Sequence, residues 1–156
     1  MTTVEEFTDL VSRVTRAIAG APLDEALESR LNREYPAGGD FFGRVRQACR
    51  DGIAAGWMCH QGEGPRKFGR ILQPGPGTHG FSVDVVDITE LVGPHHRHPN
   101  GEIDMIMPVE GDATFDHRAE GWLVYGPDTA HRPTVRGGRA WILYLLPDGA
   151  IEFTGN

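Results

Sequence analysis

The sequence predicts a mainly β domain, a sandwich or small barrel, with a helical segment ahead of it. Residues 1–56 carry apolar side chains spaced by threes and fours, which is typical of amphipathic helices. From Trp57 onward the chain consists of short segments rich in β-branched and aromatic residues, separated by Gly and Pro. The chain of 156 residues has the size of one ordinary domain, so we expect 1–56 to pack on the barrel of 57–156.

Three helices are expected in the first 56 residues. Thr3 and Glu6 form a capping-box pair that opens the first helix. Leucines at helical spacing over 23–31 predict a second helix. A third is predicted between Asp40, as its opening residue, and Gly56, as the glycine that ends it.

Five later segments are predicted to be strands: FGRIL, FSVDVVDI, EIDMIM, GWLVYG and RAWILYLL. FSVDVVDI alternates as a strand does, with Val83, Val85 and Ile88 mixed among Asp84 and Asp87. WILYLL is almost continuously apolar, so we expect it to be a central strand that is covered on both faces. The segment from Gln73 to Gly80 contains too many Gly and Pro for the interior of an element and is predicted to be a loop.

Composition and charge limit the class of partner. The net charge of -7 argues against binding to nucleic acid or to an anionic membrane, so a small ligand is expected. No segment has the ~20 apolar residues of a membrane span, and we expect a cytoplasmic protein. Cys49 and Cys59 form no C-x-x-C motif, which suits a reducing compartment and a packing role.

A cluster of histidines predicts a metal site. His96 and His98 would share one face of a strand, because side chains alternate with a period of two. The residues after them, Pro-Asn-Gly, favour a turn that returns Glu102 to that face. His131, some thirty residues later, would complete a set suited to one divalent metal ion of the first transition row, with Fe, Mn, Co, Ni and Zn all compatible.

Three residues near this cluster have two possible roles each. Asp104 shares the parity of Glu102, so it is either a general acid or base in the same cavity or a solvated carboxylate at a strand end. His95 is out of phase with the other histidines and is expected to face away from them. His79 is either part of a lid or an ordinary loop residue.

Two arginines and a tyrosine are further candidates. Arg97 and Arg132 adjoin the expected ligands and would either clamp a substrate carboxylate or form a salt-bridged rim. Tyr125 is either a core aromatic residue or a source of a hydroxyl inside the pocket. No G-x-S-x-G, P-loop or dinucleotide-binding motif is found, so no nucleotide cofactor is expected.

The metal-ligand candidates resemble the two motifs of the cupin superfamily. The first motif is matched by Gly93, His96, His98, Glu102 and Gly111. The second, a turn proline shortly before a histidine, is matched by Gly121, Pro127 and His131. The resemblance covers roughly residues 68–146. It implies a cupin-like double-sheet β-barrel, or jelly roll, with the metal inside its mouth, and a homodimer as the common assembly.

Longer segments resemble the small bacterial 4-hydroxylaminobenzoate lyase family over nearly the whole chain. They include HHRHPNGEIDMIMP, GWLVYGP, LYLLPDGAIEF and LNREYP. This resemblance implies conversion of 4-hydroxylaminobenzoate to protocatechuate and ammonia in nitroaromatic degradation, without nicotinamide or flavin. The reaction adds one water and releases one ammonia, so it needs no external electron carrier, in agreement with the missing nucleotide motifs.

Under this interpretation the substrate is a small aromatic carboxylate, and the metal either polarises the N-hydroxyl as a Lewis acid or delivers a bound hydroxide to the ring. Asp104 is the expected proton shuttle, and Arg97 or Arg132 the expected carboxylate clamp. Two alternatives stay open. One is a cupin dioxygenase or hydrolase that acts on another aromatic acid. The other is a non-catalytic cupin that binds a small carboxylate.

Overall fold

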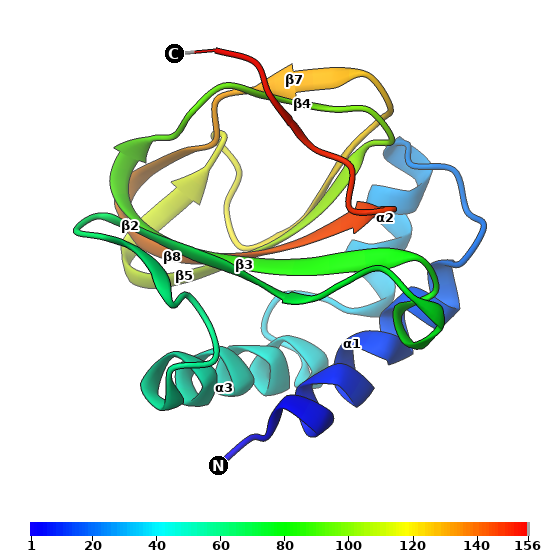
Figure 1. Cartoon of the computed structure of the whole chain (residues 1–156), viewed down its shortest axis with the longest axis horizontal. Helices are drawn as coiled ribbons and strands as arrows, with labels where there is room; N and C mark the ends of the chain where they lie inside the picture. Colours follow the sequence, from blue (N-terminus) through cyan, green and yellow to red (C-terminus); the bar gives the residue numbers. More distant parts are fainter. Residues whose placement is uncertain (156) are drawn as a thin grey trace.

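The computed structural model describes residues 1–155, in which helices precede a series of antiparallel strands (Figure 1). The helices are α1 (Val4–Ile18), α2 (Glu25–Glu34) and α3 (Asp40–Ala55). The strands are β1 (Gln61–Glu63), β2 (Arg66–Leu72), β3 (Phe81–Val92), β4 (His96–His98), β5 (Glu102–Phe115), β6 (Gly121–Tyr125), β7 (Thr129–His131), β8 (Thr134–Pro147) and β9 (Glu152–Phe153). No helix within the described range is long and apolar enough to cross a membrane.

The helix boundaries follow local capping chemistry. The capping box at the start of α1 is confirmed, with Thr3 and Glu6 each bonded to the backbone of the other. The predicted start of the second helix is two residues too early, because Asp24 accepts a backbone hydrogen bond and fixes the N-terminus of α2 immediately after itself. α3 begins where predicted and ends at Gly56, which has the left-handed conformation of a helix C-cap.

The strands form the cupin-like arrangement that the sequence predicts. In residues 1–155 a six-stranded sheet has the order β1-β2-β3-β8-β5-β6 and a three-stranded sheet has the order β7-β4-β9. Figure 1 shows β4 and β7 on the opposite side of the barrel from α1 and α3. β8 pairs with both β3 and β5 and is buried from Ala140 to Leu146, which confirms the prediction of a central strand.

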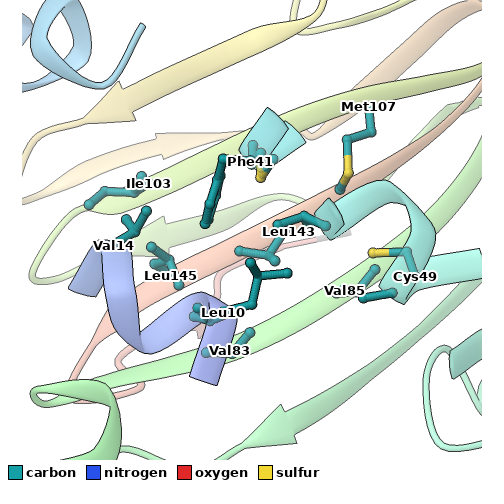
Figure 2. Close-up of a cluster of buried hydrophobic side chains, with 14 of the residues drawn as sticks. Leu10, Val14, Phe41, Cys49, Val83, Val85, Ile103, Met107, Leu143 and Leu145 are labelled. Atoms are coloured by element: carbon teal, nitrogen blue, oxygen red, sulfur yellow. The ribbon is translucent and has the colours of Figure 1, made fainter. Parts of the chain in front are cut away.

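Alternation along the large sheet separates two hydrophobic clusters. One face packs against the helices and the other faces the barrel interior. Figure 2 shows part of the helix-facing cluster, in which side chains of α1 and α3 meet those of β3, β5 and β8. The residues labelled there are Leu10, Val14, Phe41, Cys49, Val83, Val85, Ile103, Met107, Leu143 and Leu145. The helices therefore share one continuous core with the sheet.

β6 is an edge strand of the large sheet, and helix α2 covers it. The Asn32 side chain accepts a hydrogen bond from Trp122 N (2.9 Å) and donates one to Trp122 O (3.1 Å). The Glu28 carboxylate accepts another from Val124 N (2.9 Å). These contacts satisfy backbone groups that an edge strand would leave unpaired. They also fix β6, whose last residue, Tyr125, reaches the candidate site.

The loop from Gln73 to Gly80 contains a short 3-10 turn and is tied to α1. His79 Nδ1 lies 2.9 Å from the Thr15 hydroxyl, at a backbone φ of 54°. His79 therefore docks the loop on α1.

Both cysteine thiols should be inert in the native protein. Burial raises the pKa of Cys49 far above its usual range and raises that of Cys59 to about 12, so neither forms the reactive thiolate near neutral pH. We expect no reaction with Ellman's reagent at pH 8 over minutes, and reaction of both thiols after addition of guanidinium. Fast labelling of the native protein would contradict the packing of α3 and of the segment after it on the sheet.

Phe7 is fully buried between α1 and the sheet. Substitution Phe7→Ala should lower the free energy of unfolding by about 3–5 kcal/mol, because it removes apolar contact and leaves a cavity. Urea denaturation measures this. The control Val92→Ala, at an exposed position, should change stability by less than about 0.5 kcal/mol. Equal effects would mean that the helices do not share the core of the barrel.

Candidate metal centre

Backbone geometry brings the four candidate ligands together from three strands. β4 places His96 and His98 on one buried face, with Arg97 between them on the other. The chain then turns at Gly101, where φ is +88° and a Cβ would lie 2.7 Å from the Tyr125 carbonyl oxygen, so only glycine fits. Glu102 follows directly at the start of β5. His131 on β7 pairs in register with His96.

The donor atoms converge inside the barrel. His96 Nε2 and His131 Nε2 are 3.0 Å apart, and His98 Nε2 is 3.2 Å from Glu102 Oε1. One ligand atom from each of the four residues can be chosen so that all lie within 4.8 Å of one another. The arrangement is therefore a set of three imidazoles and one carboxylate that faces a common point.

Burial shows why this set fits a cation. His98 and Glu102 are fully buried, yet His98 Nε2 and both Glu102 oxygens have no hydrogen-bond partner within residues 1–155. Buried polar atoms without partners are costly, and a metal ion would satisfy all of them together. Burial disfavours the charged form of Glu102, but the neighbouring imidazoles of His96 and His98 outweigh it and hold the pKa of its carboxyl below the ordinary range. Three nitrogen donors and a carboxylate suit a divalent first-row metal.

Two ligand histidines are oriented by hydrogen bonds at Nδ1, which leaves Nε2 for a metal. His98 Nδ1 lies 3.0 Å from the Thr129 hydroxyl. His131 Nδ1 is hydrogen-bonded to the Asp116 carboxylate. Asp116 also accepts from the Tyr125 hydroxyl (2.5 Å) and from Thr134 N (2.9 Å). The Tyr125 hydroxyl thus supports a ligand from beside the site.

Asp116 is a functional candidate that sequence reasoning missed. It lies just after β5 in a left-handed turn, at φ 48°. It belongs to none of the recognised motifs, and only the tertiary structure brings it to His131. Burial opposes ionisation, but the contacts with His131 and Tyr125 hold its pKa below the usual range, so it is a carboxylate.

Asp104 lies on the same inward face of β5 as Glu102 and is fully buried, so the alternative of a solvated carboxylate is wrong. Neither carboxyl oxygen has a hydrogen-bond partner in the described part of the chain. Burial raises the pKa of Asp104 well above its usual range, and the nearby charge of Glu102 raises it further. A buried carboxyl group that favours its protonated form therefore lies beside the candidate ligands.

The two arginines that the sequence singled out lie elsewhere. Arg97 forms ion pairs with Asp128 and Glu152 on the outer face of β4. This placement corrects the expectation of a carboxylate clamp and agrees with the alternative of a salt-bridged rim. Arg132 follows β7 and is exposed, and it is not among the residues that line the cavity described next. His95 bonds through Nδ1 to the Thr154 hydroxyl (2.5 Å), outside the ligand set, as its parity predicted.

An apolar cavity with a volume of about 220 Å³ reaches the ligand set at His96. Its walls come from the inner faces of β2, β3 and β8 and from the segments around β4 and β9. The apolar lining includes Phe68, Val86, Ile88, Tyr144, Ile151 and Phe153. This volume is below the range of about 300–1,000 Å³ of sites for drug-sized ligands, so it suits a molecule with one ring.

The carboxylate of Asp116 should strengthen metal binding through His131. Asp116→Asn should weaken the affinity of the protein for Zn²⁺ or Mn²⁺ by about 10- to 100-fold, because the amide is a poorer acceptor for the His131 N–H. Competition with a chromogenic chelator measures the affinity. Asp128→Asn, at an exposed carboxylate paired with Arg97, is the matched control and should leave it unchanged. If Asp116→Asn bound the metal as tightly as Asp128→Asn does, Asp116 would have no role in metal binding.

Among solved structures, the chain is similar to an oxalate oxidase in complex with the substrate analogue glycolate, with a TM-score of 0.45 and 22% identity. That match covers 60% of this chain and 57% of the oxidase. A second similar structure is an RmlC-like cupin protein from Ralstonia eutropha JMP134, with a TM-score of 0.40 and 13% identity over 55% of this chain and 58% of that one. Both matches span less than two thirds of the solved chain.

Sequence relatives cover much more of the molecule. The family model of 4-hydroxylaminobenzoate lyase, PnbB, matches residues 9–153. A 4-hydroxylaminobenzoate lyase from Nocardioides sp. (strain LMS-CY) is 31% identical over 98% of this chain and 96% of its own length. Another, from Pseudomonas putida, is 25% identical over 93% of this chain and 90% of its own. The chain therefore belongs to the 4-hydroxylaminobenzoate lyase family.

Proposed function

We propose that this protein is a metal-dependent lyase that converts 4-hydroxylaminobenzoate to protocatechuate and ammonia. Membership of the family supports the reaction class. The observation that carries the metal dependence is the convergent set of His96, His98, Glu102 and His131, in which His98 Nε2 and both Glu102 oxygens are buried without a hydrogen-bond partner in the described residues. An apolar cavity reaches this set at His96. The cavity has the size and the lining that one aromatic ring requires.

The overall reaction balances without a redox cofactor. One water enters and one ammonia leaves, the N–O and C–N bonds break, and two ring carbons finish with hydroxyl groups. The nitrogen is reduced by two electrons and the ring is oxidised by two. A divalent ion held by the four ligands would supply Lewis acidity toward the hydroxylamino oxygen or toward water.

The protein side chains have three tasks in this proposal. The apolar walls of the cavity bind the ring and exclude water from it. Asp104, as a buried carboxylic acid beside the ligands, holds a proton at its carboxyl oxygen and delivers it to the departing nitrogen. Asp116 and Tyr125 hold His131 in its orientation.

The role of Asp104 is tested by Asp104→Asn, which keeps the shape of the neutral acid but cannot transfer its proton. We expect kcat to fall by about 10²- to 10⁴-fold with metal content and melting temperature unchanged. Asp112→Asn, at an exposed position on the same strand, is the control and should keep full activity. Normal turnover by the Asp104 variant would exclude it as the proton donor.

The reaction itself is tested by anaerobic incubation of the purified, metal-loaded protein with 4-hydroxylaminobenzoate. Ammonia and protocatechuate should form in equal amounts without oxygen. A requirement for oxygen would point instead to a dioxygenase. Tight binding without any product would point to a carboxylate-binding protein and would reject the lyase.

A further inference from the structure

The cavity beside His96 contains two arginines that sequence reasoning did not select. Arg66, Phe68 and Arg70 alternate along β2, so all three point to the same inner face. In register, Arg66 lies opposite Ile88 of β3, whereas Arg70 lies opposite Asp84. Asp84 in turn pairs with Tyr144 of β8, and Tyr144 pairs with Asp104 of β5. Arg70 is therefore level with the candidate catalytic acid, and Arg66 lies about 13 Å further along the strand.

Arg70 is already engaged by the protein. Its Nε donates to Asp84 Oδ1 (2.9 Å), and one terminal nitrogen donates to Asp84 Oδ2 (3.2 Å). The same nitrogen also donates to the Gly149 carbonyl oxygen (3.3 Å). A substrate carboxylate at this position would be repelled by the Asp84 carboxylate as well as attracted by Arg70. This arginine is thus a structural ion pair in the cavity wall.

Arg66 is placed differently. Its guanidinium carbon lies 4.4 Å from the centre of the Phe68 ring, so the side chain bends along β2 toward the interior of the cavity. It forms no ion pair with a carboxylate anywhere in residues 1–155; Glu63, its cross-strand partner on β1, is exposed. The exposed Gln61, opposite Phe68 on β1, also lines the cavity, whereas the buried His96 lines the part next to the candidate ligands.

A para-substituted benzoate has its carboxylate and its nitrogen at opposite ends of one ring. We propose that Arg66 binds the carboxylate of the aromatic acid, while the ring lies against Phe68, Val86 and Ile88 and the nitrogen substituent points toward His96. This inference rests on the proposed function and names the residue that positions its substrate. It assigns to Arg66 the anchoring role that the sequence suggested for Arg97 or Arg132. A planar guanidinium suits this role because it can donate two parallel hydrogen bonds to one carboxylate.

The test compares two stable probes, 4-hydroxybenzoate and 4-hydroxybenzamide, which share the ring and the hydroxyl group but carry an anionic carboxylate and a neutral amide, respectively. Their binding to the metal-loaded protein is measured by calorimetry for the wild type, Arg66→Met, Arg66→Lys and the control Arg136→Met, an exposed arginine of β8. We expect the wild type and the control to prefer the benzoate. Arg66→Met should lose about 10- to 100-fold in affinity for the benzoate and less than twofold for the benzamide. Arg66→Lys, which keeps the charge, should restore part of the loss.

Unchanged benzoate affinity in Arg66→Met, equal loss for both probes, or no preference for the benzoate in the wild type would each overturn the assignment. If Arg66→Met does not fold, the lysine variant decides: full benzoate affinity there would contradict a bidentate contact. Turnover by the wild type is measured separately. Benzoate discrimination through Arg66 without ammonia release would keep the anchor and reject the lyase, whereas turnover with no effect of Arg66 would keep the lyase and reject the anchor.

Discussion

The structure depends on one constraint: a carboxylate and three imidazoles are gathered in the interior of a small barrel. Glu102 and His98 are fully buried, and His96 is almost so. His98 Nε2 lies 3.2 Å from a Glu102 oxygen, and His96 Nε2 and His131 Nε2 each lie 3.6 Å from one. Such a cluster is expensive without a cation, because each ionised or polar group has lost its water. The cation that satisfies it would also hold three separate strands together.

Much of the remaining architecture can be understood as support for this cluster. The period of β4 brings two histidines to one face, and Gly101 lets the chain return close enough for Glu102 to join them. β8 forms the centre of the sheet between β3 and β5. The helices cover the outer face of that sheet and leave the inner face for the site. α2 then fixes β6, and through Tyr125 and Asp116 this edge strand orients His131.

Local patterns were sufficient to predict the helices, the central strand and three of the four candidate ligands, whereas His131 lies about thirty residues further along the chain. The capping box at Thr3, the apolar run in β8 and the H-x-H spacing each act over a few residues, so the sequence alone shows them. Parity also placed Asp104 beside Glu102. The start of α2 was displaced because the cap at Asp24 outweighs the leucine spacing before it.

The rest of the site is non-local. Adjacency in sequence suggested Arg97 as a clamp, yet on a strand the residue between two inward histidines must face outward, where Asp128 and Glu152 hold it. Asp116 reaches His131 through a turn that no motif marks. Arg66 lies on β2, about thirty residues before the histidines, and only the order of strands in the sheet brings it to their cavity.

The most direct test of the account is the metal content of the chain, measured by mass spectrometry after loading with first-row divalent ions and removal of excess. The account predicts one ion per chain in the wild type and in the control His60→Ala, an exposed histidine, and almost none in His98→Ala. A wild-type protein that retains no ion, or a His98 variant that retains as much as the wild type, would contradict it.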